Sequence, residues 1–416
     1  MLACQRLTSI CAALACATLI GAVQAAKNYG PGVSDTEIRI GQTMPYSGPL
    51  SSYSSIARAQ AAYFDKINAE GGVNGRKIRP ISLDDGFNPA RTVEQTRKLI
   101  DEERVLALFG SLGTVTNNAI RNEVNARKIP HVFLLSGASQ SADPHSFPWS
   151  MGWTPLYQAE ARIYAQYLLR ANPTAKIAVL YQNDDLGKEY LKGFKDGLGQ
   201  QAATMIVAET TYAPTDPTVD SQVVALKASG ADVLMNFATA KAAAQAIRKA
   251  HDIGWKPMQL VSYTSSSVEA VLKPAGVDKA LGIVSAGFVK DPADPQWKDD
   301  RAMQEWRAWM KTYYPDGNPA DVMNVIGYSL AQTMVQVLRQ CGNDLSRENV
   351  MRQAAGLRRI ELPMLLPGIR VDTSARDYMP VKQVQLMRFD GKKWVRFGDI
   401  LTTEVRSTDV QSAQVK

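Results

Sequence analysis

Residues 105–135, VLALFGSLGTVTNNAIRNEVNARKIPHVFLL, decide the fold class. The stretch opens with an apolar run at 105–110, continues with a helical pattern at 115–128 and ends in a second apolar run at 131–135. Two such strands with a helix between them form a unit in which the strands are parallel. Parallel strands need cover on both faces, so this stretch predicts an α/β fold.

The same alternation continues in both directions. Before the stretch, strand signals at 38–41 and 75–84 alternate with helical patterns at 54–70 and 88–103. After Trp153 a second series follows, with helices expected at 157–172, 187–199, 219–229 and 240–253 and strands at 177–181, 205–211, 232–237 and 259–263. A chain of 416 residues is too long for one ordinary domain. We therefore expect two open parallel sheets in two lobes.

The pattern changes after a strand signal at 282–285. A tryptophan-rich helix is expected at 296–314 and a long helix at 320–341, and residues 383–400 alternate around the Asp390-Gly391 turn as a β-hairpin does. Trp306 and Trp309 share one helical face, which favours core packing over a ligand-binding aromatic box.

The N-terminus has the pattern of a signal peptide. Its one charge, Arg6, precedes an apolar stretch at 7–23, and small residues precede Ala26. The apolar run is too short and interrupted for a membrane anchor, and a lipoprotein site at Cys16 fits poorly. Such a signal would direct export of the chain. Its removal at about residue 25 would leave Cys341 as the one cysteine, which we expect to be a packed small hydrophobe.

Motifs for enzymatic or nucleic-acid chemistry are missing. The three histidines have no metal-binding spacing, and no Walker A, GxSxG or CxxC motif occurs. The formal net charge of +7 is spread among acidic residues without a run of five like charges. We expect no catalytic residues, no metal, no cofactor and no nucleic-acid partner.

Polar loops follow two neighbouring predicted strands. Open α/β sheets bind their ligands at the carboxyl ends of strands. The loop at 110–114, GSLGT, leaves backbone accessible and opens a helix at Thr114, where a hydroxyl and free N–H groups attract a carboxylate. The alternative is that Thr114 is a plain N-cap. The loop at 136–139, SGAS, is ordinary alone, but beside the first it makes a shared anion site more credible.

Three stretches resemble a known family. IRIG at 38–41 with SGP at 47–49, NAEGGVNGR at 68–76 and YQNDDLG at 181–187 look like the branched-chain amino-acid-binding branch of periplasmic solute-binding proteins. The resemblance extends over about 38–400. It implies a type I periplasmic binding fold, two lobes joined by a three-strand hinge, and a monomer that passes a small carboxylate to an ABC permease.

The resemblance also implies a set of ligand-binding residues. Thr114 matches the hydroxyl residue that binds the ligand carboxylate, with Leu112 beside it, and Tyr53 matches an aromatic that covers the ligand. The remaining predicted contacts, some from the loop at 136–139 and some from the second lobe, are Gly137, Ala138, Ser139, Tyr157, Asp184, Thr239 and Thr264.

One departure from the family bears on the ligand. Amino-acid binders of this family resemble one another in carrying an acid in the loop after the strand at 259–261, where it pairs with the ligand ammonium. Here residues 262–267 read SYTSSS. An enclosed ammonium without a counter-charge is costly, so aromatic or other organic acids become candidates beside Leu, Ile and Val. Asp184 is the first alternative partner for an ammonium.

The expected organisation is a signal peptide at 1–25, a first lobe at 35–152 with a return segment at 288–368, and a second lobe at 153–287. A crossover and the terminal hairpin of the second lobe occupy 369–402, and 403–416 form a tail. Two other functions stay open. One is a periplasmic ligand sensor that reports to a receptor, and the less favoured one is an exported hydrolase.

Overall fold

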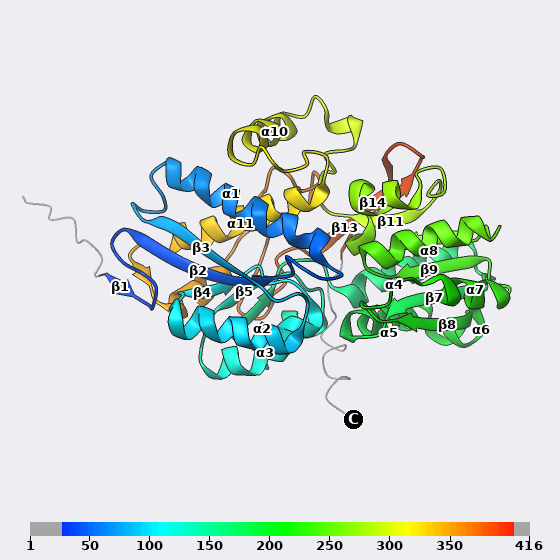
Figure 1. The fold of residues 1–416 in the computed structure, drawn as a ribbon, viewed down its shortest axis with the longest axis horizontal. Helices are drawn as coiled ribbons and strands as arrows, with labels where there is room; N and C mark the ends of the chain where they lie inside the picture. The colour runs from blue at the N-terminus through cyan, green and yellow to red at the C-terminus, as the bar shows by residue number, and fades with distance from the viewer. Residues whose placement is uncertain (1–26, 403–416) are drawn as a thin grey trace, which may run out of the picture.

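The computed structural model describes residues 27–402, which form two lobes, each built around its own sheet (Figure 1). The predicted signal peptide, its three cysteines and the predicted tail at 403–416 lie outside the described residues. The sheet of lobe 1 is fully parallel, with the order β3-β2-β4-β5-β6. Its strands are β2 (Glu37–Met44), β3 (Lys77–Asp84), β4 (Ala107–Phe109), β5 (His131–Leu134) and β6 (Ser150–Gly152).

The sheet of lobe 2 has seven strands in the order β14-β13-β11-β10-β9-β7-β8. They are β7 (Ile177–Gln182), β8 (Ile206–Tyr212), β9 (Val233–Phe237), β10 (Met258–Val261), β11 (Val284–Gly287), β13 (Gln383–Phe389) and β14 (Trp394–Thr402). Strands β7 to β11 are parallel, whereas β13 and β14 form an antiparallel hairpin against β11. The hairpin expected at 383–400 is therefore present and closes one edge of this sheet.

Helices cover both sheets. In lobe 1, α11 packs along α1, and α2 packs beside α3; in lobe 2, α4 packs along α5. The helices are α1 (Ser55–Ala69), α2 (Pro89–Arg97), α3 (Thr114–Ala126), α4 (Tyr157–Ala171), α5 (Asp185–Leu198), α6 (Ala202–Met205), α7 (Asp220–Ala228), α8 (Ala240–Asp252), α9 (Lys273–Ala275), α10 (Arg301–Tyr313), α11 (Val322–Cys341) and α12 (Arg347–Ala354).

Two helices differ from their predicted extents. The segment expected to be one helix at 88–103 consists of α2 followed directly by a π-helical turn, Lys98–Glu102. The helix expected at 296–314 is split, because Asp294 caps a short 3-10 turn, Pro295–Trp297, and Asp300 then caps α10. Each Asp accepts a backbone N–H, and a new N-cap ends one helical segment and begins another. Trp306 and Trp309 of α10 are buried, so their predicted core role is confirmed.

The chain passes between the lobes three times. It crosses after β6, again after β11, and finally between α12 and β13. The crossovers lie side by side, since Trp153 packs edge-on against Phe288 and Val289 pairs with Leu365. The type I fold with a three-strand hinge is thus confirmed, while the residue boundaries of the predicted segments stay predictions.

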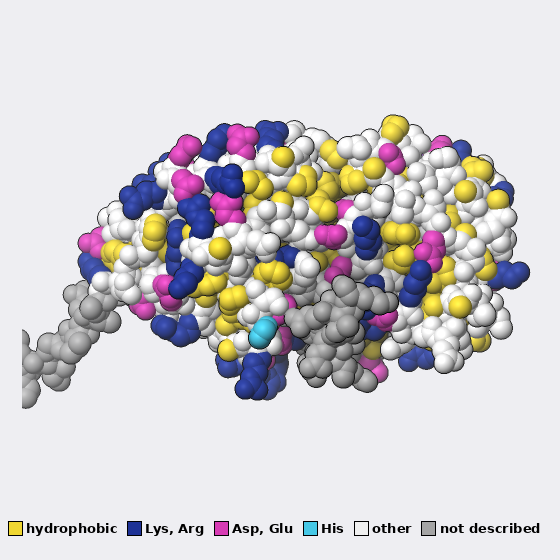
Figure 2. Space-filling model, turned by 90° about the horizontal axis from the view of Figure 1, so that it is seen from below, with side chains coloured by type: hydrophobic (Ala, Val, Ile, Leu, Met, Phe, Trp, Pro, Cys, Tyr) yellow, Lys and Arg dark blue, Asp and Glu magenta, His cyan; other side chains and the backbone are white. Residues whose placement is uncertain are grey.

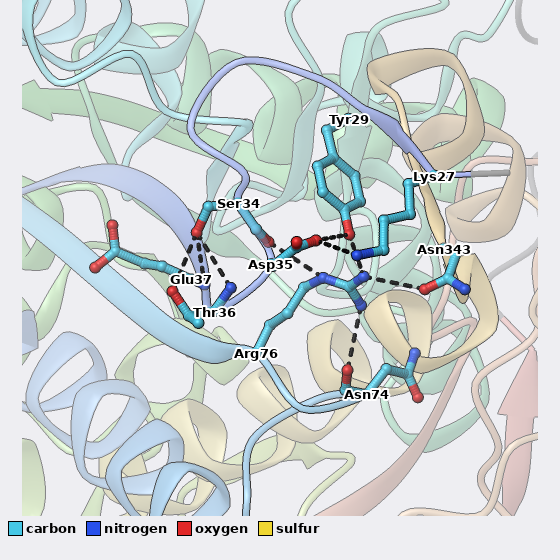
Figure 3. Close-up of polar contacts among 9 residues, drawn as sticks. All are labelled: Lys27, Tyr29, Ser34, Asp35, Thr36, Glu37, Asn74, Arg76 and Asn343. Atoms are coloured by element: carbon cyan, nitrogen blue, oxygen red, sulfur yellow. Dashed lines mark hydrogen bonds and ion pairs between the residues drawn. The ribbon is translucent and has the colours of Figure 1, made fainter.

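The NAEGGVNGR stretch has a structural role at the end of lobe 1 far from lobe 2 (Figure 1). Arg76 is 3% exposed and donates to the carbonyl oxygens of Ser34 and Asn74 and to the side chains of Tyr29 and Asn343, as Figure 3 shows. These contacts hold β1 (Asn28–Tyr29) beside β12 (Asp344–Leu345), with which it pairs. The most family-specific stretch of sequence therefore fastens the start of the described chain to lobe 1.

The surface is mixed in charge. On the face drawn in Figure 2, Lys and Arg side chains lie among Asp and Glu side chains. Among the helices of residues 27–402, none combines the length and apolarity needed to cross a membrane.

Candidate functional site

A cavity of about 80 Å³ lies where the two lobes meet the first crossover. It is lined by Leu50, Tyr53, Ile56, Phe87, Leu112, Gly113, Thr114, Leu135, Thr154, Tyr157, Gln182, Leu186, Thr239, Tyr263, Thr264, Met323 and Ile326. None of these residues is charged at neutral pH. The wall is apolar apart from hydroxyls, one amide and backbone groups, which is the composition of a small-molecule site.

The lobe 1 end of the cavity is the N-terminus of α3. The N-cap is Gly113, at φ 108° and without a side-chain cap, so no side chain of its own satisfies the first N–H groups of the helix. A Cβ on Gly113 would lie 2.4 Å from Thr116 Oγ1 and 2.6 Å from the Phe87 ring, so only glycine fits. Open amides and the helix dipole together favour an anion at this position.

Two hydroxyls stand beside this helix end. Thr114 Oγ1 and Ser136 Oγ are 2.9 Å apart and buried, and Ser136 Oγ also accepts from the N–H of Ala138. They come from the loops after β4 and β5, which are neighbours in the sheet. The two loops that the sequence singled out are therefore adjacent.

Tyr157 closes the cavity at the start of α4. Burial raises the pKa of its hydroxyl, which keeps it neutral. Its N–H donates to the carbonyl oxygen of Gly137, and a Cβ on Gly137 would come within 2.3 Å of Pro155 O and 2.7 Å of the Tyr157 ring. Glycine at 137 therefore permits the close approach of the β5 loop to the crossover.

The lobe 2 wall is polar but internally paired. Gln182 Oε1 accepts from the hydroxyls of Tyr212 and Thr239, and Gln182 Nε2 donates to Asp184. Burial raises the pKa of Tyr212. The ends of β7, β8 and β9 thus present a neutral wall whose hydrogen-bonding groups are already occupied.

The loop after β10 carries no acid and is fixed by its own serines. Ser262 Oγ lies 2.7 Å from Thr264 Oγ1, Ser265 donates to Ala238 O, and Ser267 caps the turn that follows. Tyr263 and Thr264 line the cavity. This side of the cavity has no counter-charge for an ammonium group.

Tyr53 joins the lobes across the cavity. Its hydroxyl donates to Thr264 O at 3.0 Å and accepts from the N–H of Ala240, the first residue of α8, at 3.1 Å. Burial raises the pKa of Tyr53 to about 12, so the hydroxyl keeps its proton. The two lobes are therefore in contact in this structure, with the cavity between them.

A family model for periplasmic binding proteins matches residues 37–393 of this chain, nearly all of the two-lobed body. The chain belongs to the periplasmic binding protein family. Members of this family are substrate-binding proteins of the periplasm, and the two lobes with a cavity between them have the architecture expected of them.

Curated relatives come from the branched-chain amino-acid branch. A Leu/Ile/Val-binding protein homolog 7 of Brucella abortus is 26% identical over 258 residues, which are 58% of this periplasmic binding protein and 62% of the relative. A homolog 8 of the same organism is 20% identical over 264 residues, 61% of this chain and 65% of the relative. The matched region thus spans less than two thirds of either relative.

Solved structures share the fold. A substrate-binding periplasmic protein from Ralstonia solanacearum is 24% identical with a TM-score of 0.78, covering 87% of this chain and all of that one. A branched-chain amino acid ABC transporter protein from Thermus thermophilus with bound valine is 16% identical at TM-score 0.79 (89% and 97% covered). An R. palustris solute-binding protein in complex with benzoate is 21% identical at TM-score 0.73 (88% and 98% covered).

The sequence-predicted contacts fall into two groups in this binding protein. Those that line the cavity are Tyr53, Leu112, Thr114, Tyr157, Thr239 and Thr264. Gly137 packs against Pro155 and Tyr157 behind the wall, and Ala138 lines a separate polar pocket of about 220 Å³ at the lobe boundary. All ten ligand contacts stay predictions.

Ser139 and Asp184 have local partners. Ser139 Oγ donates to Glu189 Oε1 at 2.6 Å, which links the β5 loop to α5 of the other lobe. Asp184 caps α5 by accepting from the N–H of Gly187 and also accepts from Gln182. Neither side chain lines the main cavity, and burial raises the pKa of Asp184, which opposes its ionisation.

Several residues that line the cavity were not predicted from the sequence. Phe87 has a left-handed backbone conformation, φ 59°, and its N–H donates to the Asp85 carboxylate, which stabilises that conformation. Met323 and Ile326 come from the first turns of α11, far along the chain. Thr154 lies in the first crossover. Of these four, only Thr154 carried a signal, because it follows a strand end of the same sheet as Thr114 and Ser136.

Replacing Tyr53 by phenylalanine removes both lobe-to-lobe hydrogen bonds of its hydroxyl. The N–H of Ala240 would lose its partner in the closed state, which costs about 1–2 kcal/mol. We expect ligand affinity to fall about ten-fold, mostly through faster dissociation, in stopped-flow and calorimetric titrations. Tyr46→Phe is the matched control, because the Tyr46 hydroxyl bonds Ser82 within lobe 1. Equal dissociation rates for Tyr53→Phe and wild type would contradict this account.

Proposed function

We propose that this protein is the exported substrate-binding component of an ABC importer and that it captures an apolar or aromatic carboxylate without an ammonium group. The ligand binds in the interlobe cavity, and closure of the lobes presents the loaded protein to an inner-membrane permease. The protein acts as a monomer in the periplasm and performs no catalysis. The observation that carries the proposal is a cavity whose lining residues are all uncharged.

The uncharged wall argues against an amino acid. Transferring an ammonium group into an enclosed site without a partner costs several kcal/mol. The loop 262–267 offers hydroxyls and ring surface only, and Asp184 is turned to Gln182 and the start of α5. A ligand without an ammonium avoids this cost.

The lobe 1 end supports a carboxylate. The uncapped N-terminus of α3, with the hydroxyls of Thr114 and Ser136 beside it, supplies donors and a favourable dipole without a fixed cation. An anion held by such donors needs no counter-ion. Affinity for carboxylates in general therefore comes from lobe 1.

The apolar walls and the volume of the cavity favour a ligand with a compact, hydrophobic body. Leu50, Ile56, Leu186, Met323 and Ile326 surround the space between the two polar ends. For comparison, an engineered cavity of about 150 Å³ binds benzene. A cavity of about 80 Å³ suits a short branched chain or, with slight opening of the lobes, a single ring.

The test is a thermal-shift screen of the protein from Ala26 onward. The panel contains matched pairs that differ only in the ammonium, such as 4-methylpentanoate with leucine and 3-phenylpropanoate with phenylalanine, together with benzoate. A ligand that binds only the native state raises the Tm by mass action. Shifts with the plain acids alone support the proposal, and shifts with the amino acids alone would refute its specificity.

A further inference from the structure

Thr154, in the first crossover, is a lining residue of the cavity with an unpaired hydroxyl. Thr154 is 5% exposed, it belongs to the cavity lining, and its Oγ1 is fully buried with no hydrogen-bond partner. A buried hydroxyl without a partner costs stability, and such groups in native structures call for an explanation. Thr154 is therefore set apart from ordinary wall residues.

Most other polar side chains of the wall have partners. Thr114 pairs with Ser136, Thr264 pairs with Ser262, and Gln182 and Thr239 belong to the network of the lobe 2 wall. Within the described chain, Thr154 is the lining residue whose side chain has a fully buried polar atom left unpaired.

The sheet places Thr154 beside the proposed carboxylate site. β5 and β6 are parallel neighbours with Leu134 opposite Gly152, so Ser136 and Thr154 each follow their strand by two residues. β4 lies on the other side of β5, and Leu112 pairs with Leu135. The hydroxyls of Thr114, Ser136 and Thr154 thus come from the carboxyl ends of three adjacent parallel strands, where such sheets bind ligands.

The crossover holds Thr154 firmly in place. Its neighbour Trp153 is fully buried and donates from Nε1 to Thr333 Oγ1 at 3.1 Å. On the other side, Pro155 O accepts from the Tyr263 hydroxyl at 3.2 Å. The Tyr263 hydroxyl is thereby directed at Pro155 O, and Thr154 Oγ1 is left without a partner of hydrogen-bonding geometry. A group fixed by its neighbours loses little entropy when it binds a ligand.

We propose that Thr154 is a third hydroxyl of the carboxylate site and donates from Oγ1 to the second oxygen of the bound carboxylate. This inference rests on the proposed function, because it concerns the same cavity and the same class of ligand. A carboxylate has room for several donors, and hydrogen bonds to charged groups are the strong ones. Because Thr154 belongs to the hinge, its bond links the occupied site directly to the segment that bends when the lobes close.

The experiment compares wild type with Thr154→Val and Thr154→Ser. Valine keeps the branched shape and removes the hydroxyl, and serine keeps the hydroxyl. Titration calorimetry with benzoate and 4-methylpentanoate is expected to show affinity at least ten-fold lower for Thr154→Val and within about three-fold of wild type for Thr154→Ser. The Tm of ligand-free Thr154→Val should equal or exceed that of wild type, because the unpaired hydroxyl is gone.

Three results would overturn the inference. Unchanged acid affinity in Thr154→Val means that Thr154 does not bind the ligand. An equal loss of affinity for acids and for the neutral amides benzamide and 4-methylpentanamide means that it does not bind the carboxylate. A markedly lowered Tm of the ligand-free variant means that the hydroxyl is structural. Failure of wild type itself to bind either acid would instead refute the proposed function, so the two failures are distinguishable.

Discussion

Thr114→Val is expected to weaken the binding of carboxylate ligands by one to two orders of magnitude. The substitution removes the hydroxyl nearest the open end of α3 and leaves Ser136 without its 2.9 Å partner. A hydrogen bond to a charged group contributes about 1.5–3 kcal/mol, which corresponds to this loss. Titration calorimetry with the acids that stabilise wild type measures the effect directly.

Thr116→Val is the matched control for this variant. Thr116 is a buried threonine two residues further along α3, and its hydroxyl donates to Leu112 O rather than lining the cavity. It should lose stability without a comparable loss of affinity. If Thr116→Val weakened binding as much as Thr114→Val, the effect would come from the helix as a whole and the assignment of Thr114 would fail.

Glu160 should make the stability of lobe 2 depend on pH. Its carboxyl is fully buried and accepts from the hydroxyls of Tyr164 and Tyr190, at 2.5 and 2.7 Å, and from the N–H of Tyr263 at 2.6 Å. Burial outweighs these bonds and raises the pKa of Glu160 to about 7. Since the unfolded chain has an ordinary glutamate pKa of about 4.3, folding favours the protonated carboxyl.

The direction of the effect follows from this difference. The contribution of Glu160 to the free energy of unfolding is fully present below the unfolded pKa and is lost as the pH rises through about 7. Glu160→Gln mimics the protonated form at every pH. Between pH 5 and pH 8, the free energy of unfolding should therefore shift by about 2–3 kcal/mol in favour of the variant relative to wild type.

Urea unfolding of both proteins at several pH values measures this shift. Taking the difference between variant and wild type removes the contributions of other groups such as Asp291, whose pKa burial also raises. Glu348→Gln, at an exposed position of α12, is the control and should follow wild type across the whole range. A pH-independent difference between Glu160→Gln and wild type would show that the buried carboxyl does not titrate in this range.

Local sequence patterns were enough to predict most of the fold. The strand–helix alternation at 105–135 became β4, α3 and β5, and the Asp390-Gly391 turn became the hairpin of β13 and β14. Such elements depend on periodicity and turn residues a few positions apart. Splitting of the helix expected at 296–314 was missed because a cap at Asp300 competes with an otherwise continuous helical pattern.

The candidate site was less predictable because it is assembled from distant segments. Loops directly after strands, such as the one that ends at Thr114, could be inferred, since the carboxyl ends of parallel strands meet at one edge. Met323 and Ile326 reach the cavity because α11 packs on α1. Phe87 reaches it because its own backbone is in the left-handed conformation. No local pattern indicates those approaches.

The NAEGGVNGR stretch was easy to recognise in the sequence but does not belong to the candidate site. It was the most specific sign of the family, yet its Arg76 organises a polar cluster at the end of lobe 1 remote from lobe 2 (Figure 3). A family-specific motif can therefore identify an architecture without taking part in its ligand site.

One titration decides whether the interlobe site prefers carboxylates that lack an ammonium group. Calorimetry of the purified protein with 4-methylpentanoate and with leucine compares two ligands of the same shape that differ in a single charged group. We expect the plain acid to bind at least a hundred-fold tighter than leucine, because the cavity wall has no carboxylate to pair with an ammonium. Tighter binding of leucine would show that the site accepts an ammonium group.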